Sequence, residues 1–193
     1  MATDSRTIGG FVTELSAKVP TPGGGAAAAV SAAIGEAAAA MAAAYTMRKK
    51  DIESGAADKA TALQTTMAVG KVLAFADADA AAYEELQTTW KATDMPAEQK
   101  AAIEARALAV PVSLIEHCRT QISAIEAFLP HCNTGITSDA KVGIHLLAGA
   151  ARAAYQTAMC NSPSAEAKAQ MKSSLLFILA AETKVLALDR LED

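Results

Sequence analysis

The sequence predicts an all-α protein, a multi-helix bundle, because it is rich in alanine and poor in aromatic residues. Of the 193 residues, 48 are alanine, and aromatic side chains supply only 4% although hydrophobic types reach 52%. Alanine has the highest helix propensity, whereas sandwiches and barrels need more β-branched and aromatic residues. No strand pattern, low-complexity linker or change of composition divides the chain. We therefore expect a single helical domain over residues 1–193.

The N-terminal half of the chain predicts three helical stretches. Apolar residues at helical spacing favour an amphipathic helix over residues 8–19. A break rich in proline and glycine, over 20–25, separates it from an alanine-rich helix that runs to Tyr45. A helix over 53–90 would reach about 50 Å, so it is either broken near Gly70 or used in an oligomer contact. The residues expected to mark its buried faces are Leu63, Met67, Val69, Val72, Phe75, Tyr83, Leu86 and Trp90.

The C-terminal half predicts a further series of helices. One is expected over 96–129, with Pro111 kinking it or splitting it in two. The next runs from about 139 to 161, with Thr137 or Ser138 as its N-cap. A last helix starts after a serine–proline pair and ends near the C-terminus. The residues expected to face its core are Met171, Leu175, Leu176, Ile178, Leu179 and Val185.

The alanine-rich helix is expected to lie at the centre of the bundle, buried on all sides. Its sequence from Ala26 to Tyr45 is almost entirely apolar, a pattern that also suits a membrane span. However, the carboxylate of Glu36 in its middle would cost about 2.5 kcal/mol or more in lipid, and alanine gains little there. Small side chains instead let neighbouring helices approach closely. We therefore expect no membrane association.

Charge and cysteine content narrow the function classes further. The net charge is −4 and the pI about 5.4, which argues against a nucleic-acid partner. The first residues lack a secretory signal pattern, so we expect a cytoplasmic protein. Cys118, Cys132 and Cys160 are odd in number and widely spaced, and we expect reduced, buried thiols. No histidine has an HExxH or CxxC neighbour, so the sequence predicts no metal site.

Two loops that precede helices are candidate ligand sites. The first is Thr21-Pro22-Gly23-Gly24-Gly25, whose glycines allow close approach of a ligand to the N–H groups of the next helix. It lacks the Gly-Lys-Ser/Thr of a Walker loop, and no strand precedes it as in a dinucleotide fingerprint. The second loop contains Asn133, Ser138 and Asp139. Both loops also have a purely structural interpretation, as a turn or a helix start.

Charged residues inside the predicted helices are the other candidates. Asp77 and Asp79 are two positions apart, so at most one faces a given partner and the other is expected to be solvated. A carboxylate flanked by alanines is a candidate for a tuned acid or base. The basic run Arg48-Lys49-Lys50 is either a solvated helix end or a site for an anionic tail. His145 shares a helix face with two cations, which is a candidate binding surface.

Taken in order, these motifs resemble the cyclodeaminase/cyclohydrolase family, which contains formimidoyltetrahydrofolate cyclodeaminases and methenyltetrahydrofolate cyclohydrolases. The resemblance spans nearly the whole chain. Two departures are Thr157, where the family often has asparagine, and a segment between the aromatic residue and the mid-helix proline that is shorter than in some members. The matching elements are Val19-Pro20-Thr21-Pro22-Gly23-Gly24-Gly25, Tyr45-Thr46 with Arg48-Lys49-Lys50, Asp77-Ala78-Asp79 with Tyr83, Pro111, Asn133 with Ser138-Asp139, and Asn161.

The resemblance implies a folate one-carbon enzyme that opens or closes a C–N bond at the methenyl or formimino carbon. It implies a tetrahydrofolate derivative as substrate, no metal or other cofactor, and a homodimer whose active site lies near the subunit contact. Asp139, Asp79 and Lys50 are then the expected catalytic residues. The expected substrate-binding residues are Thr21, Pro22, Gly23, Gly24, Gly25, Arg48, Lys49, Asn133, Ser138 and Asn161.

Several alternatives stay open at this point. Hydrolysis of 5,10-methenyltetrahydrofolate to 10-formyltetrahydrofolate is slightly preferred over release of ammonia from 5-formiminotetrahydrofolate, because the chain contains no formiminotransferase segment. A helical dimer that binds folate or another pterin without catalysis is the first rival. A purely structural helical oligomer is the second, and it would tolerate Gly24→Val.

Overall fold

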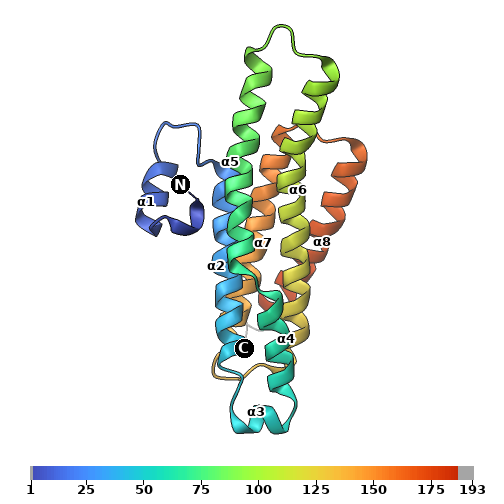
Figure 1. Cartoon of the computed structure of the whole chain (residues 1–193). Coiled ribbons are helices and arrows are strands. Elements are labelled where there is room, and N and C mark those ends of the chain that lie inside the picture. The colour runs from blue at the N-terminus through green and yellow to red at the C-terminus, as the bar shows by residue number, and fades with distance from the viewer. Residues whose placement is uncertain (1, 187–193) are drawn as a thin grey trace.

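The structure is a computed structural model that describes residues 2–186. Within that range it contains helices and no strand, which confirms the all-α prediction (Figure 1). The elements, in order, are η1 (Thr3–Ser5), α1 (Ile8–Leu15), α2 (Gly24–Ala44), α3 (Lys49–Glu53), α4 (Ala56–Thr66), α5 (Val69–Lys91), α6 (Ala97–Phe128), η2 (Leu129–His131), α7 (Thr137–Cys160) and α8 (Ala165–Leu186).

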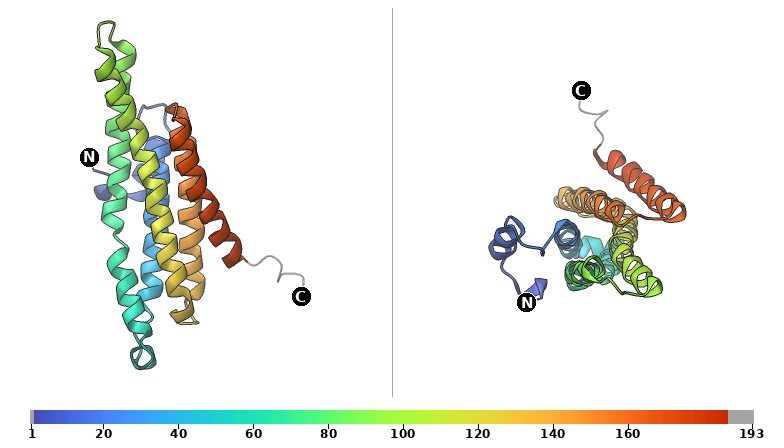
Figure 2. Two further views of the ribbon diagram at one scale, coloured as in Figure 1. Left: turned by 90° about the vertical axis from the view of Figure 1, so that its right-hand side faces the viewer. Right: turned by 90° about the horizontal axis from the view of Figure 1, so that it is seen from above.

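Four long helices, α2, α5, α6 and α7, run along the bundle and enclose its core (Figure 1). The most extensive contact is between α2 and α7, and α6 packs against both α5 and α7. Helix α8 lies on the outer side of α6 and α7 (Figure 2). The hairpin of α5 and α6 extends beyond the ends of α2 and α7 (Figure 1). Fully buried isoleucine, leucine and alanine side chains fill the space between these helices.

Small residues set the close approach of α2 and α7. A Cβ atom added to Gly143 would lie 2.8 Å from the backbone oxygen of Gly35, and one added to Gly35 would lie 3.0 Å from the backbone oxygen of Gly143. Near one end of the same pair, Gly24 of α2 faces Thr157 of α7. The two helices are therefore antiparallel, and the N-terminal end of α2 lies beside the C-terminal end of α7.

Helix α2 is not buried on all sides, contrary to the expectation. Ile34 is 52% and Met41 41% exposed, so one apolar face of α2 is uncovered in the single chain. Glu36, on the opposite side, is fully buried and hydrogen-bonded to His117 of α6. Within residues 2–186, α2 alone is long and apolar enough to cross a membrane, but 56% of that stretch is buried inside the bundle.

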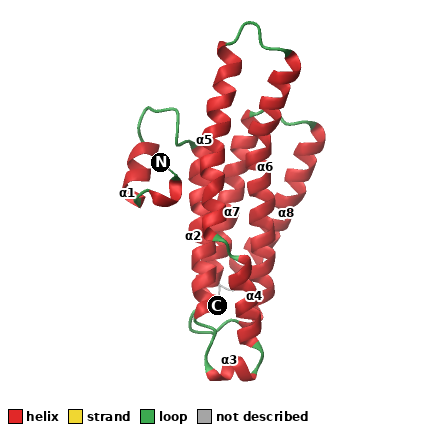
Figure 3. Cartoon of the chain, in the orientation of Figure 1, coloured by secondary structure: helices red, strands yellow, loops and turns green. Residues whose placement is uncertain are grey.

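In the N-terminal half, one helix boundary differs from the prediction and one predicted break is found. Helix α1 ends at Leu15, because Phe11 is its one buried residue and little apolar burial remains to extend it. Val19, expected inside this helix, lies in the following loop and is 48% exposed. The long helix expected over 53–90 is interrupted at Met67 and Ala68 (Figure 3), which confirms a break close to the predicted position.

In the C-terminal half, the expectations for the mid-helix proline and for the N-cap of α7 need correction. Helix α6 continues through Pro111, so the split is wrong; the proline is buried in a 32-residue helix that neighbouring helices hold on several sides. Helix α7 begins at Thr137 without a side-chain cap. Thr137 and Ser138 already belong to its first turn, and their hydroxyl groups donate to the Asn133 carbonyl oxygen and to the Asp139 carboxylate.

Two expectations about burial near the C-terminus are also wrong. Leu176 and Leu179 of α8 are 55% and 53% exposed, whereas Met171 and Ile178 face the core as predicted. The α8 helix therefore buries a narrower stripe than its apolar content suggests. The expectation that the last helix ends near the C-terminus concerns residues that lie partly outside the described range.

One cysteine and the helix face of His145 differ from the expectation in their exposure and contacts. Cys118 and Cys132 are buried free thiols, and burial raises the pKa of Cys118 to about 12, but Cys160 is exposed. His145 does not lie on an open surface. Its Nδ1 atom is 3.2 Å from Glu182 of α8, which also pairs with Arg152, so these residues tie α8 to α7.

Candidate active site

A cavity of about 490 Å³ lies at the N-terminal end of α2. Its wall comes from the glycine loop, from α5, from α6 and from the C-terminal end of α7. Residues that are far apart in the sequence therefore meet here, and six of them are predicted site residues: Thr21, Gly23, Gly24, Gly25, Asp79 and Asn161. Pro22 is buried beside them and follows a cis peptide bond, without lining the cavity itself.

Asp79 of α5 is the carboxylate that reaches this cavity. Its Oδ2 atom accepts a hydrogen bond of 3.1 Å from the backbone N–H of Ala26, in the first turn of α2. The contact is possible because residue 25 is glycine: a Cβ atom there would lie 2.7 Å from Oδ2 and still closer to Oδ1. The glycine loop therefore serves to bring a carboxylate against a helix N-terminus.

The surroundings of Asp79 change its acidity. Burial raises the pKa of the Asp79 carboxyl group, and the hydrogen bond from Ala26 partly opposes this. Desolvation favours the neutral acid, whereas a backbone N–H donor favours the anion. A carboxyl group with a raised pKa exchanges its proton closer to neutral pH, which suits a general acid or base.

The expectation that one of Asp77 and Asp79 is solvated needs a correction. Asp77 is not simply solvated: its Oδ1 atom accepts hydrogen bonds from the backbone N–H and the hydroxyl group of Thr3, at 3.0 and 2.7 Å. Each of the two carboxylates thus has its own partner. Asp77 holds η1 against α5, while Asp79 faces the cavity.

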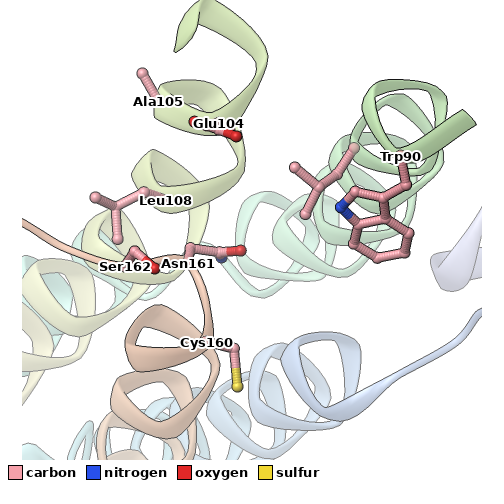
Figure 4. Close-up of a pocket in the computed structure, with 8 residues that line it drawn as sticks. Trp90, Glu104, Ala105, Leu108, Cys160, Asn161 and Ser162 are labelled. Atoms are coloured by element: carbon pink, nitrogen blue, oxygen red, sulfur yellow. The ribbon is translucent and has the colours of Figure 1, made fainter. Parts of the chain in front are cut away.

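Asn161 terminates α7 and forms another part of the wall. Its side-chain nitrogen donates to the carbonyl oxygen of Ala107 in α6 at 3.2 Å. This bond fixes the amide, and Figure 4 shows its oxygen turned toward the opening on the side of Trp90. An amide acceptor fixed in this way can orient a donor group of a ligand.

The aromatic wall of the cavity was not predicted. The indole of Trp90 and the ring of Tyr83 pack edge to face with centroids 5.9 Å apart, and both line the cavity. The sequence interpretation placed both on buried faces, but Trp90 is 62% and Tyr83 36% exposed. A usable signal was the spacing of Asp79, Tyr83, Leu86 and Trp90, which are four, seven and eleven positions along one helix face.

The other predicted residues form a second cluster at the opposite end of α2. Asn133 donates from its backbone N–H to the Thr46 hydroxyl at 3.0 Å and from its side chain to the carbonyl oxygen of Tyr45 at 3.0 Å. These bonds attach the loop before α7 to the end of α2. Ser138 and Asp139 lie in the first turn of α7, after this loop, with 3.2 Å between the hydroxyl and the carboxylate.

The basic run Arg48-Lys49-Lys50 lies beside this second cluster, but two of its side chains already form ion pairs within the chain. Arg48 forms a 2.7 Å ion pair with Asp51, and these hydrogen bonds lower the pKa of the Asp51 carboxyl group. Lys49 pairs loosely with Glu53 at 3.8 Å and is exposed. Lys50 is exposed too, so a single protomer does not supply the burial that its expected proton-transfer role requires.

The two clusters are separated by the length of α2. Asp79 contacts the first turn of this helix and Asn133 contacts the residue after its last turn. A helix of 21 residues spans about 30 Å. One protomer therefore does not bring Asp139 and Asp79 to the same ligand. Within residues 2–186, no three histidine, cysteine, aspartate or glutamate side chains are grouped so as to hold a metal ion.

Comparison with known proteins identifies the relatives of this arrangement. The sequence profile of the formiminotransferase-cyclodeaminase family matches residues 7–175, a range that contains both clusters. The fold is similar to that of formiminotetrahydrofolate cyclodeaminase from Thermotoga maritima, with a TM-score of 0.79 and 21% sequence identity over 95% of this chain and 98% of that chain. No individual curated protein matches the chain in a sequence search. The family match confirms the resemblance drawn from the motifs.

Proposed function

The chain belongs to the formiminotransferase-cyclodeaminase family, and we propose that it is an enzyme that makes or breaks a C–N bond at the one-carbon unit of a tetrahydrofolate substrate. The observation that carries this proposal is the Asp79 carboxyl group, held by Ala26 in a cavity of about 490 Å³ with a pKa raised by burial. The cavity volume lies within the usual range for small-molecule sites. We propose no cofactor besides the folate itself.

The first candidate reaction is hydrolysis of 5,10-methenyltetrahydrofolate. Water adds to the methenyl carbon, and the resulting tetrahedral carbon then expels one ring nitrogen. Asp79 accepts one proton of the attacking water and later returns it to the departing nitrogen, so one carboxyl group serves both steps. The remaining hydroxyl proton passes to solvent as the formyl C=O bond forms. In its anionic form it also offsets the positive charge that the methenyl group carries.

The second candidate is the cyclodeaminase reaction. Here N10 attacks the carbon of the protonated formimino group, the same kind of tetrahedral carbon forms, and ammonia leaves as the methenyl group is made. The proton taken from N10 is delivered to the departing nitrogen, which the same carboxyl group can do. This reading is favoured by the name of the structural relative, a formiminotetrahydrofolate cyclodeaminase.

We further propose that the active unit is a homodimer. The apolar face of α2 that includes Ile34 and Met41 is uncovered, and Ile8 and Val12 of α1 beside it are 81% and 56% exposed. A two-fold axis perpendicular to α2 would place the N-terminal end of one α2 beside the C-terminal end of the other. Asp79 would then share a ligand with Asp139, Asn133 and Lys50 of the partner subunit.

The second cluster would supply the remaining roles in such a dimer. Asp139 is the further acid or base, and Lys50 orients the substrate or protonates the leaving nitrogen once the contact buries it. Arg48 and Lys49 meet the glutamate tail, while Asn133 and Ser138 position the ring system. A cytoplasmic location remains a prediction.

The decisive experiment offers the purified protein both substrates. Loss of the methenyl chromophore above its rate in buffer reports hydrolysis, and ammonia release from 5-formiminotetrahydrofolate reports deamination. We expect one of these signals, and we expect Asp79→Asn and Asp139→Asn to remove it while the helical circular dichroism spectrum stays unchanged. Folate binding without either signal would support the non-catalytic alternative. The absence of both turnover and folate binding would overturn the proposal.

A further inference from the structure

Trp90 is the single tryptophan of the chain, and it stands at the junction of two cavities. A second cavity, of about 420 Å³, adjoins the one that contains Asp79. Leu86, Trp90, Cys160 and Asn161 line both cavities, so the two share a wall at these side chains. An indole that is 62% exposed at such a junction leaves a large flat apolar surface uncovered in the free protein.

The second cavity has a distinct chemical character. Figure 4 shows the Trp90 ring on one side of the opening and Leu108 and Asn161 on the other. Glu104 is the one charged residue among those that line it. The gap is therefore bounded by an indole and a leucine, with an acidic group near one side. A flat, neutral aromatic group suits this space, and the carboxylate disfavours an anionic group within it.

We propose that Trp90 is a substrate-binding residue whose indole packs against the neutral aryl ring of a folate, so that the ligand spans both cavities. The pterin ring lies at Asp79 and the α2 N-terminus, and the aminobenzoyl ring lies between Trp90 and Leu108. This inference rests on the proposed function, because it assumes a folate at Asp79. In this inference the cavity between Trp90 and Leu108 recognises the aminobenzoyl ring, which does not react.

Two ligands, one with and one without the aryl ring, distinguish stacking of Trp90 on that ring from a general effect of Trp90 on the cavity. Binding of 5-formyltetrahydrofolate, which carries the aryl ring, and of 6-methyltetrahydropterin, which lacks it, is measured by calorimetry. We expect Trp90→Ala to weaken the folate about 10- to 100-fold, the usual effect of losing one aromatic stacking partner. The pterin should bind equally to both proteins. Trp90→Phe keeps a ring and should restore most of the folate affinity.

Matched measurements keep the result specific. Leu179→Ala removes another exposed apolar side chain, 53% exposed on α8, and should leave both affinities unchanged. In the unsubstituted protein, folate should change the fluorescence of the single tryptophan and the pterin should change it less. Circular dichroism and light scattering of Trp90→Ala report its fold and oligomeric state.

Each contrary result has its own meaning. Equal folate affinity of Trp90→Ala and the unsubstituted protein overturns the role of Trp90 and leaves the proposed function standing. Equal weakening of folate and pterin shows that the indole shapes the Asp79 cavity, which also overturns it. Loss of the dimer in Trp90→Ala would make Trp90 a subunit contact instead. Binding of neither ligand to the unsubstituted protein overturns this inference together with the folate function.

Discussion

Gly25 and Asp79 depend on each other through a single contact. A Cβ atom at position 25 overlaps the carboxylate, so Gly25→Ala should push Asp79 away from the Ala26 N–H. Because a misplacement of about 1 Å can cost roughly 100-fold in rate, we expect a fall of that order in kcat/KM for the folate substrate. Steady-state kinetics measure this, with thermal unfolding to verify that the bundle still forms.

The control lies outside the cavity. Nothing lies within 4 Å of a Cβ atom added at Gly70, in the first turn of α5. Gly70→Ala should therefore keep kcat/KM close to that of the unsubstituted protein. Similar activity in the two variants would show that the position of Asp79 does not matter for the reaction.

The half-buried carboxyl group of Asp79 should also make stability depend on pH. Burial raises its pKa in the folded state, so over the interval between the unfolded and folded pKa values the folded chain binds more protons. Stability attributable to this group therefore falls as pH rises through that interval. Asp79→Asn removes the charge, so it should be more stable than the unsubstituted protein above the interval.

The comparison of the two proteins is made by urea unfolding at several pH values. Below the interval Asp79 is protonated in both states, and the advantage of Asp79→Asn should shrink. An advantage that stays constant with pH would mean that burial does not govern the ionisation of Asp79.

Sequence reasoning at this scale found the residues with unusual backbone or charge and missed those recruited by packing. The glycine loop and Asp79 were predictable because glycine runs and carboxylates among alanines are rare patterns. Trp90 was placed on a buried face because an aromatic residue at helical spacing usually belongs to a core. It is exposed because the hairpin of α5 and α6 extends beyond α2 and α7 (Figure 1), which no local pattern reveals.

At the scale of elements, the contact of α2 with α7 should be sensitive to a single methyl group. Gly143→Ala places a Cβ atom 2.8 Å from the backbone oxygen of Gly35, and neither backbone can move without separating two packed helices. Overpacking of this kind costs about 1–3 kcal/mol, so we expect the free energy of unfolding to fall by that amount. Denaturant unfolding at equilibrium measures it.

Gly149, on the same helix, is the matched control. A Cβ atom there meets nothing within 4 Å, so Gly149→Ala should gain only helix propensity, about 0.5–1 kcal/mol. Opposite signs for two identical substitutions on one helix would establish the close contact. Equal gains in stability would show that α2 and α7 are not packed this tightly.

Helices were predictable where apolar spacing dominates, and less so where one residue acts as a signal. The alanine-rich helix was expected after the break over 20–25 and up to Tyr45, and it is observed as Gly24–Ala44. Pro111 is a local breaker, yet packing on several sides holds α6 together. Thr137 and Ser138 show the same limit, because a hydroxyl residue near a helix start can join the first turn instead of capping it.

At the scale of the whole molecule, the order of the motifs in the sequence did not reveal how far apart they lie in the fold. The family resemblance implied one active site near a subunit contact, and a single chain divides the motifs between the two ends of α2, about 30 Å apart, since its first turn meets Asp79 and its other end meets Asn133. Motif order does not report distance, because an antiparallel pair such as α2 and α7 brings the end of one helix to the start of the other. A dimer that joins opposite ends would reunite the motifs.

Mixing two inactive variants tests this arrangement. In the shared-site dimer, an Asp79→Asn protomer paired with an Asp139→Asn protomer has one site with both substitutions and one with neither. After unfolding and refolding together in equal amounts, half of the dimers should be mixed and half of their sites intact. We therefore expect about a quarter of the unsubstituted activity from two inactive proteins.

As a control, Asp79→Asn refolded with Gly25→Ala should gain no activity beyond the sum of the two, because both changes lie at the same end of α2. Continued inactivity of the first mixture, with mixed dimers demonstrated by mass spectrometry, would overturn the sharing of one site between two protomers.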